Sequence, residues 1–74
     1  MNHLYVEPQP SAHLESAPIT FYVLQNINDQ FVTSFRYRTE KEAVDVARKL
    51  GFTPWVARVR ITNKRNPEHW RFAD

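Results

Sequence analysis

The segment from Thr39 to Gly51 constrains the fold most, because it carries start and stop signals for one helix. Thr39 and Glu42 form a capping box, in which each side chain binds an N–H that the first helical turn leaves free. Apolar residues then recur at the spacing of one helix face. Gly51 is the only glycine and occupies the position of a left-handed C-terminal cap, while Pro54 prevents continuation. The sequence therefore predicts a helix over 40–50.

The region before this helix has the alternation of a β-hairpin. Residues 19–25 alternate with apolar side chains on both faces, which is typical of a central strand. An Asn- and Asp-rich turn follows at 26–30. Residues 31–38 then predict a second strand, with Phe31, Thr33, Phe35 and Tyr37 on one face and Val32, Ser34, Arg36 and Arg38 on the other. The short turn predicts an antiparallel pair.

The region after the helix contains one clear strand and one ambiguous segment. Residues 55–62 alternate regularly and predict a third strand, antiparallel to the central one. A polar loop follows, and residues 69–72 form either a short fourth strand or an extended tail. We therefore expect an α+β fold, a small β-β-α-β domain whose antiparallel sheet has three strands, or four if the last segment pairs. One helix packs on one face of this sheet.

The helix has a defined apolar side that must find partners in the sheet. We expect the following contacts: Ala43, Val46, Ala47 and Leu50 against Phe31, Phe35, Val59 and Ile61, with Ile19, Phe21 and Val23 completing the core.

Residues 1–17 show no sustained periodicity and contain two prolines, so we expect a flexible N-terminal arm. The alternative is an arm that packs on the domain or on a partner through residues 4–6. A single domain then spans 18–74, since a chain of 74 residues is too short for a second one.

Composition excludes several classes of protein. Without cysteine the chain is neither a disulfide-stapled domain nor a Cys-ligated zinc module. It has no apolar run of about 18 residues and no signal sequence, so we expect no membrane segment and a cytoplasmic location. His3, His13 and His69 lack metal-site spacing, and one glycine cannot build a phosphate loop. We expect no metal, no cofactor and no enzymatic activity.

Charge is distributed unevenly along the chain, although the net charge is only +2. Residues 1–30 contain three acidic and no basic residues, whereas 31–74 contain ten basic and five acidic residues, which gives −3 and +5. Either the basic part binds an anionic partner, or the two parts neutralise each other within the fold.

Strand periodicity gathers the arginines on one side. If the helix covers the apolar face, the arginines of 31–38 and 55–62 lie on the opposite face, with Tyr22 between them. The candidate nucleic-acid or partner-binding residues are Tyr22, Arg36, Arg38, Arg58, Arg60, Lys64, Arg65, Trp70 and Arg71. Arginine binds phosphate bidentately and tyrosine stacks on unpaired bases. The alternatives are an ordinary solvated sheet face, or a face partly covered by the tail at 70–72.

In size and order of elements, the chain resembles small phage inhibitors of host RNA polymerase and some anti-CRISPR proteins. Residues 37–43 read Tyr-x-Thr-x-x-Glu-Ala and resemble the arm-binding domains of phage integrases, in which three strands precede the helix. Neither resemblance includes a diagnostic motif, so no residue role is carried over from it.

We therefore expect a non-enzymatic binding module that uses a basic and aromatic sheet face, with nucleic acid slightly favoured as the partner. The alternative is a small protein-binding inhibitor or regulator of the phage or mobile-element kind, anchored by Tyr22, Trp70 or Phe72. A free strand edge also offers a route to a homodimer.

Overall fold

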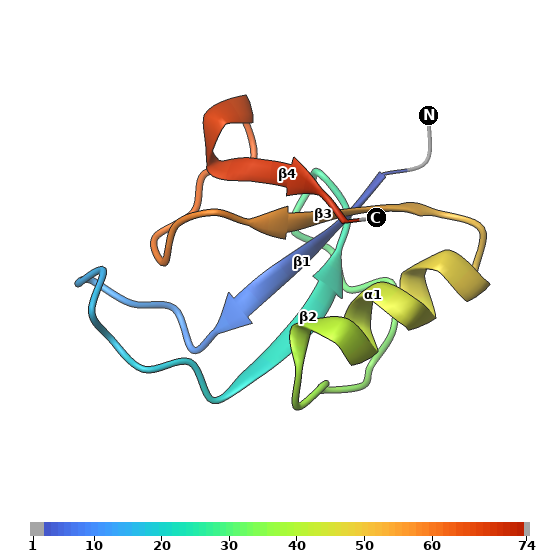
Figure 1. The fold of residues 1–74 in the computed structure, drawn as a ribbon, viewed down its shortest axis with the longest axis horizontal. Coiled ribbons are helices and arrows are strands. Elements are labelled where there is room, and N and C mark those ends of the chain that lie inside the picture. The colour runs from blue at the N-terminus through green and yellow to red at the C-terminus, as the bar shows by residue number, and fades with distance from the viewer. Residues whose placement is uncertain (1–2, 74) are drawn as a thin grey trace.

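Four strands form one mixed sheet, in the spatial order β2-β1-β3-β4, and one α-helix covers a face of it (Figure 1). The computed structural model describes residues 3–73. In chain order the elements are β1 (His3–Gln9), β2 (Phe21–Gln25), α1 (Glu40–Lys49), β3 (Thr53–Ala57), a 3-10 turn η1 (Pro67–His69) and β4 (Trp70–Phe72). The predicted α+β class and β-β-α-β order are confirmed, and the last segment is a strand. The sheet is mixed rather than antiparallel, because β1 and β3 run parallel.

The predicted N-terminal arm is wrong for residues 3–9, which form the central strand β1. This strand pairs antiparallel with β2 and parallel with β3. Leu4 and Val6 are each only 1% exposed. Pro8 breaks the apolar alternation in the sequence, but the register with β3 ends at Val6, so Pro8 has a strand on one side only. Proline is tolerated in such a position when its nitrogen faces away from the partner strand.

Because β1 lies at the centre of the sheet, β2, which was predicted to be central, lies at the edge. The return segment, residues 31–38, is consequently not the regular strand that its alternation predicts. It touches β2 through two isolated bridges, Gln25 with Phe31 and Tyr22 with Tyr37. The seven residues 31–37 therefore lie opposite only the four residues 22–25 of β2, and the extra residues bulge away from the sheet. Tyr37 alone of its alternating aromatic residues is buried.

Strand β3 ends at Ala57, five residues before the predicted end at 62. Beyond it, the carboxylate of Glu15 accepts the backbone N–H groups of Arg60 at 2.7 Å and Ile61 at 3.1 Å. A buried or partly buried N–H needs an acceptor, and here a side chain supplies it in place of a neighbouring strand. The segment after Ala57 can therefore leave the sheet without unpaired N–H groups at these two residues.

Helix α1 forms as its local signals predict. The Thr39 hydroxyl accepts the N–H of Glu42 at 3.1 Å, and Gly51 adopts a positive φ of 86° after the last turn. The helix ends at Lys49, with Leu50 as its cap residue. In the described part of the chain, no helix is long and apolar enough to cross a membrane.

The core lies between α1 and one face of the sheet, and its membership differs from the prediction. Ala43 and Ala47 are buried as expected, together with Val44. Their partners are mainly residues of the strands, Leu4, Val6, Leu24 and Val56, with Tyr37 from the return segment. The predicted partners Phe31 and Phe35 are 65% and 68% exposed, and Leu50 and Ile61 are also exposed. β1 supplies the apolar area that the return segment was expected to supply.

The central position of β1 predicts a large effect of Leu4→Ala on stability. Removing a fully buried leucine side chain costs about 2–5 kcal/mol of unfolding free energy, which urea denaturation will measure. Leu14→Ala is the matched control, because Leu14 is 67% exposed in the loop after β1 and should change stability by less than about 0.5 kcal/mol. Equal effects of the two substitutions would contradict the central strand.

Candidate functional site

The face of the sheet away from α1 carries an aromatic cluster, defined here as His3, Tyr5, Trp55, Trp70 and Phe72. The alternation of β1 places His3 and Tyr5 opposite the buried Leu4 and Val6. Trp55 and Phe72 are register partners on β3 and β4, with ring centroids 4.0 Å apart. Phe72 is 51% exposed. The cluster therefore presents tilted and edge-on aromatic rings on the sheet face near β4.

The rings of this cluster are held by contacts with each other. The indole N–H of Trp55 donates to Nδ1 of His3 at 2.6 Å, and the His3 ring meets Trp55 edge-on at 5.3 Å. Tyr5 meets Trp70 edge-on at 4.8 Å. Trp70 is only 4% exposed, and its indole N–H donates to the Asn63 carbonyl at 3.0 Å. Trp70 thus packs against Tyr5 as a buried member of the cluster and does not form its exposed surface.

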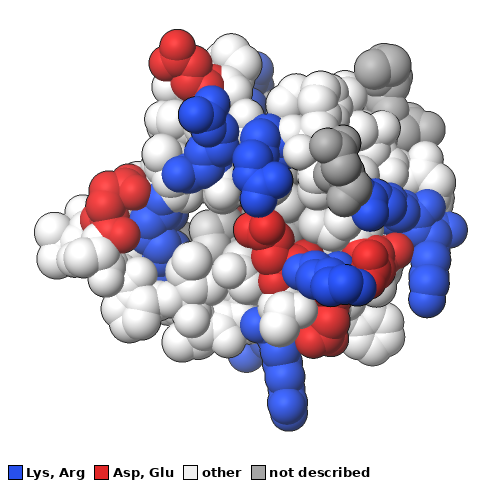
Figure 2. Space-filling view, viewed as in Figure 1, with Lys and Arg blue, Asp and Glu red and all other residues white. Residues whose placement is uncertain are grey.

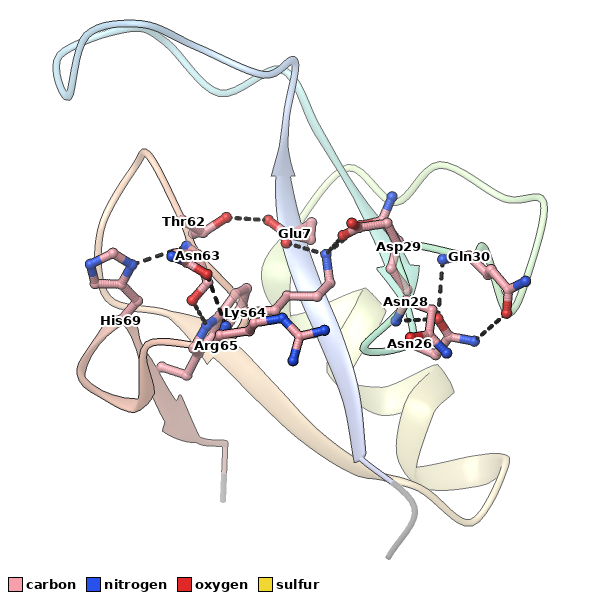
Figure 3. Close-up of polar contacts among 12 residues, drawn as sticks. Glu7, Asn26, Asn28, Asp29, Gln30, Thr62, Asn63, Lys64, Arg65 and His69 are labelled. Atoms are coloured by element: carbon pink, nitrogen blue, oxygen red, sulfur yellow. Dashed lines mark hydrogen bonds and ion pairs between the residues drawn. The ribbon is translucent and has the colours of Figure 1, made fainter.

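A charged network crosses the same face beside the aromatic cluster. Figure 3 shows Lys64 reaching from the loop after β3, across β1, to Asp29 in the turn after β2. Its ammonium donates to Glu7 at 2.6 Å, Gln25 at 2.8 Å and Asp29 at 2.6 Å, which occupies all three of its protons. The Thr62 hydroxyl donates to the other oxygen of Glu7 at 2.6 Å. The side chains of Lys64 and Glu7 are less than one-tenth exposed.

This network shows where the acidic residues of the first thirty positions find their partners. Glu7 and Asp29 form ion pairs with Lys64, and Glu15 binds backbone N–H groups of the segment after β3. These three are all the acidic residues of the first thirty. All three are therefore bound within the fold, and Lys64, which pairs with two of them, is not free on the predicted binding surface.

Two basic residues remain near the aromatic cluster or the network. Arg65 is exposed and lines a small pocket with Tyr5, Trp55 and Trp70. Arg71 points to the helix-bearing side, because its register partner is the buried Val56, and it contacts Glu40 at 3.3 Å. Of the predicted set, the aromatic cluster therefore gathers Lys64, Arg65 and Trp70, but not Arg71.

The other predicted residues divide between two places, so the continuous basic face expected opposite the helix is wrong. Tyr22, Arg58 and Arg60 line one cavity together, and Tyr22 packs against the same core as α1. Arg36 lies over the ring of Phe21 at 4.6 Å. Arg38 is exposed. Strand periodicity failed here because residues 31–38 and 58–62 are not strands.

Figure 2 shows basic and acidic side chains interspersed over the face in view, without one continuous positive area. Within residues 3–73, no three His, Asp or Glu side chains converge as metal ligands would. Comparisons of the chain with protein-family models, with curated proteins and with solved structures found no match. Its function is therefore argued from these surfaces.

Sequence reasoning missed His3, Tyr5 and Glu7, because residues 1–17 were assigned to an arm. The alternation of polar or aromatic with aliphatic residues over His3–Val6 was the signal that could have identified a strand. Asp29 carried no such signal, since an Asp in a turn is ordinary. Trp55 and Phe72 were placed correctly in alternating segments, but their pairing depends on the register of β3 and β4.

The buried ion pair predicts that Lys64→Met destabilises the fold strongly. The substitution leaves the Glu7 carboxylate buried without its counter-ion, which typically costs about 3–5 kcal/mol of unfolding free energy. The double substitution Glu7→Gln with Lys64→Met should recover part of this loss, because no buried charge remains. Urea denaturation followed by tryptophan fluorescence measures both. A loss under about 1 kcal/mol for Lys64→Met, as for an exposed pair, would contradict the network.

The Asp29–Lys64 pair predicts a stability difference that depends on pH. The hydrogen bond and the charge of Lys64 hold the pKa of Asp29 below its ordinary value of 3.8. A lowered pKa in the folded state stabilises the fold above pH 3.8, and this contribution is lost as the pH falls through the folded-state value. Asp29→Asn should therefore be less stable than the wild type at neutral pH and approach it under acid conditions.

Asparagine is a suitable replacement because Asp29 has a positive φ of 62°, which asparagine also tolerates. The measurement is the denaturation midpoint of both proteins across the acid range. The same difference at neutral and at strongly acid pH would show that the carboxylate charge is not the cause.

Proposed function

We propose that this chain is a non-enzymatic binding module whose aromatic cluster takes an unpaired base of single-stranded nucleic acid. One observation carries the proposal: Trp55 and Phe72 form a close ring pair on an open sheet face, and Phe72 is half exposed. Sheet faces of this kind bind single strands by stacking bases on aromatic side chains, each worth about 1–3 kcal/mol. The cytoplasm is the proposed compartment.

One exposed basic residue beside the cluster supports a nucleic-acid partner. Arg65 is exposed beside Tyr5 and Trp55, where it could meet a phosphate of the bound strand. Lys64 is neutralised by two carboxylates and contributes no free charge. The proposal therefore predicts binding dominated by stacking, with a shallow dependence on salt because few phosphates are neutralised.

The rigidity of the cluster favours binding over catalysis. Trp70 is buried edge-on against Tyr5, and the hydrogen bond from Trp55 to His3 fixes the edge of the indole. Rings already held in place lose little conformational freedom when a base stacks on them. These contacts supply a preformed surface and no arrangement of nucleophile and base.

A protein partner is the second candidate, favoured by a different surface. Phe31 and Phe35 are about two-thirds exposed and line a groove with Phe21 and Val23. Exposed aromatic residues beside a groove are typical anchors of protein interfaces. The anchor expected at Trp70 is wrong, because that side chain is buried. β4 is an edge strand, so a homodimer paired along β4 is also proposed as an arrangement to test.

The stacking surface predicts that Phe72→Ala weakens binding of a short single-stranded oligonucleotide by about 5- to 100-fold, as expected for one lost stacked ring. Fluorescence anisotropy of a labelled oligonucleotide, with DNA and RNA and at low and physiological salt, measures the dissociation constant. Phe35→Ala is the matched control, since it removes a phenylalanine that is even more exposed than Phe72 and lies in the groove outside the aromatic cluster.

Three outcomes would count against the proposal. The first is an absence of binding at low salt, and the second is an equal loss for Phe35→Ala and Phe72→Ala. The third is stronger binding to duplex than to single strands, because paired bases cannot stack on the cluster. The second and third outcomes would favour a contact made elsewhere on the protein.

A further inference from the structure

A cavity of about 450 Å³ lies on the helix-bearing side of the sheet, away from the aromatic cluster. No residue of α1 lines it. Its polar lining is Tyr22, Arg58, Arg60 and Glu15, and its apolar walls include Pro8 and Ile19. Cavities of this size with apolar walls and a few convergent polar groups are typical of small-molecule sites.

Arg60 is fixed in the wall of this cavity by main-chain carbonyls. It is only 8% exposed. Its Nε donates to the carbonyl of Ala17 at 3.0 Å, and its Nη2 donates to those of Pro18, at 3.2 Å, and Pro10. Carbonyl groups orient the guanidinium but do not cancel its charge. The remaining nitrogen, Nη1, is buried and has no acceptor within residues 3–73. This donor stays unpaired, which is costly unless a bound group accepts its hydrogen bond.

Arg58 adds a second guanidinium that the protein leaves unneutralised. It is exposed, and among the described residues it forms no ion pair. Its backbone N–H is held by the His69 carbonyl at 2.7 Å, so the base of the side chain is fixed. Lys64 and Arg71, by contrast, already have carboxylate partners.

The acidic residue in the lining does not fill the place of an anion. Both oxygens of Glu15 accept backbone N–H groups, from Arg60 at 2.7 Å and Ile61 at 3.1 Å. These bonds hold the pKa of Glu15 below its ordinary value of 4.5, so it stays charged. The cavity therefore has two arginines against one carboxylate, and it keeps a net positive charge.

Tyr22 supplies a surface for the uncharged part of a ligand. Its ring is half-buried against the core, which restricts its rotation. Burial, and next the charge of Glu40, raise the pKa of Tyr22 above its ordinary value of 10. At neutral pH the hydroxyl is therefore protonated and can donate a hydrogen bond.

We propose that the cavity lined by Tyr22, Arg58 and Arg60 binds a small organic anion. Its carboxylate or phosphate group is held by the two guanidinium groups, and its ring or apolar body lies against Tyr22 and Ile19. The site is independent of the aromatic cluster, which lies on the other face of the sheet. The proposal therefore does not require that the chain bind nucleic acid.

The test follows the side-chain Nε–Hε signals of the arginines and the ring signals of Tyr22 by NMR, during titration with phenyl phosphate, benzoate and inorganic phosphate. We expect saturable shifts at Arg58, Arg60 and Tyr22 with at least one ring-bearing anion. That anion should bind several-fold more tightly than inorganic phosphate, because the apolar walls contact only a ring. Binding of neither ring-bearing anion, or equal affinity for inorganic phosphate, would overturn the proposal.

The variant is Arg58→Gln, which removes the charge of an exposed side chain and keeps most of its length. We expect it to weaken binding of the ring-bearing anion about tenfold or more, as for loss of one charge-assisted hydrogen bond. Arg38→Gln is the control, because Arg38 is exposed outside the cavity. Equal losses for the two variants would overturn the site. Oligonucleotide binding by Arg58→Gln should match the wild type, which separates this proposal from the function assigned to the aromatic cluster.

Discussion

The pairing of β1 with both β2 and β3 is the interaction on which the rest of this structure depends. A strand that is hydrogen-bonded on both sides directs alternate side chains to the two opposite faces of the sheet. Leu4 and Val6 consequently form the centre of the helix-bearing core, and His3, Tyr5 and Glu7 are directed to the other face. The aromatic cluster and the Lys64 network therefore both follow from this one strand.

Charged side chains then hold the loops of this small domain to its sheet. Lys64 connects the loop after β3 to β1 and to the turn after β2. Arg60 binds the carbonyls of the loop between β1 and β2, and Glu15 from that loop binds the chain beyond β3. A domain of this size buries a limited apolar area. These ion pairs and hydrogen bonds therefore hold loops in place that the core does not contact. They also occupy Lys64, which is therefore not free for a partner.

Elements whose signals lie close together in the chain were predicted correctly, whereas elements that depend on a distant partner strand were not. Helix α1 was predicted because the Thr39 hydroxyl caps its first turn and Gly51 ends it, and both act on neighbouring backbone. Residues 31–38 were misassigned because alternation indicates a strand only where a partner edge of matching register exists. The partner β2 matches them at Phe31 and Tyr37 alone. The predicted arginine face failed with that strand. Tyr22, Arg58 and Arg60 do lie together, but on the side that bears the helix rather than opposite it.

The sequence by itself determined the α+β class, the boundaries of the helix and the absence of cysteine chemistry. Each of these follows from residues that are close together in the chain or from composition. Tertiary structure alone decided that β1 lies at the centre, that β1 and β3 run parallel, and which arginines are buried. These features depend on contacts between residues about fifty positions apart, such as Val6 with Val56 and Glu7 with Lys64. Periodicity reports which side chains share a face of one strand, but not which strand lies beside it.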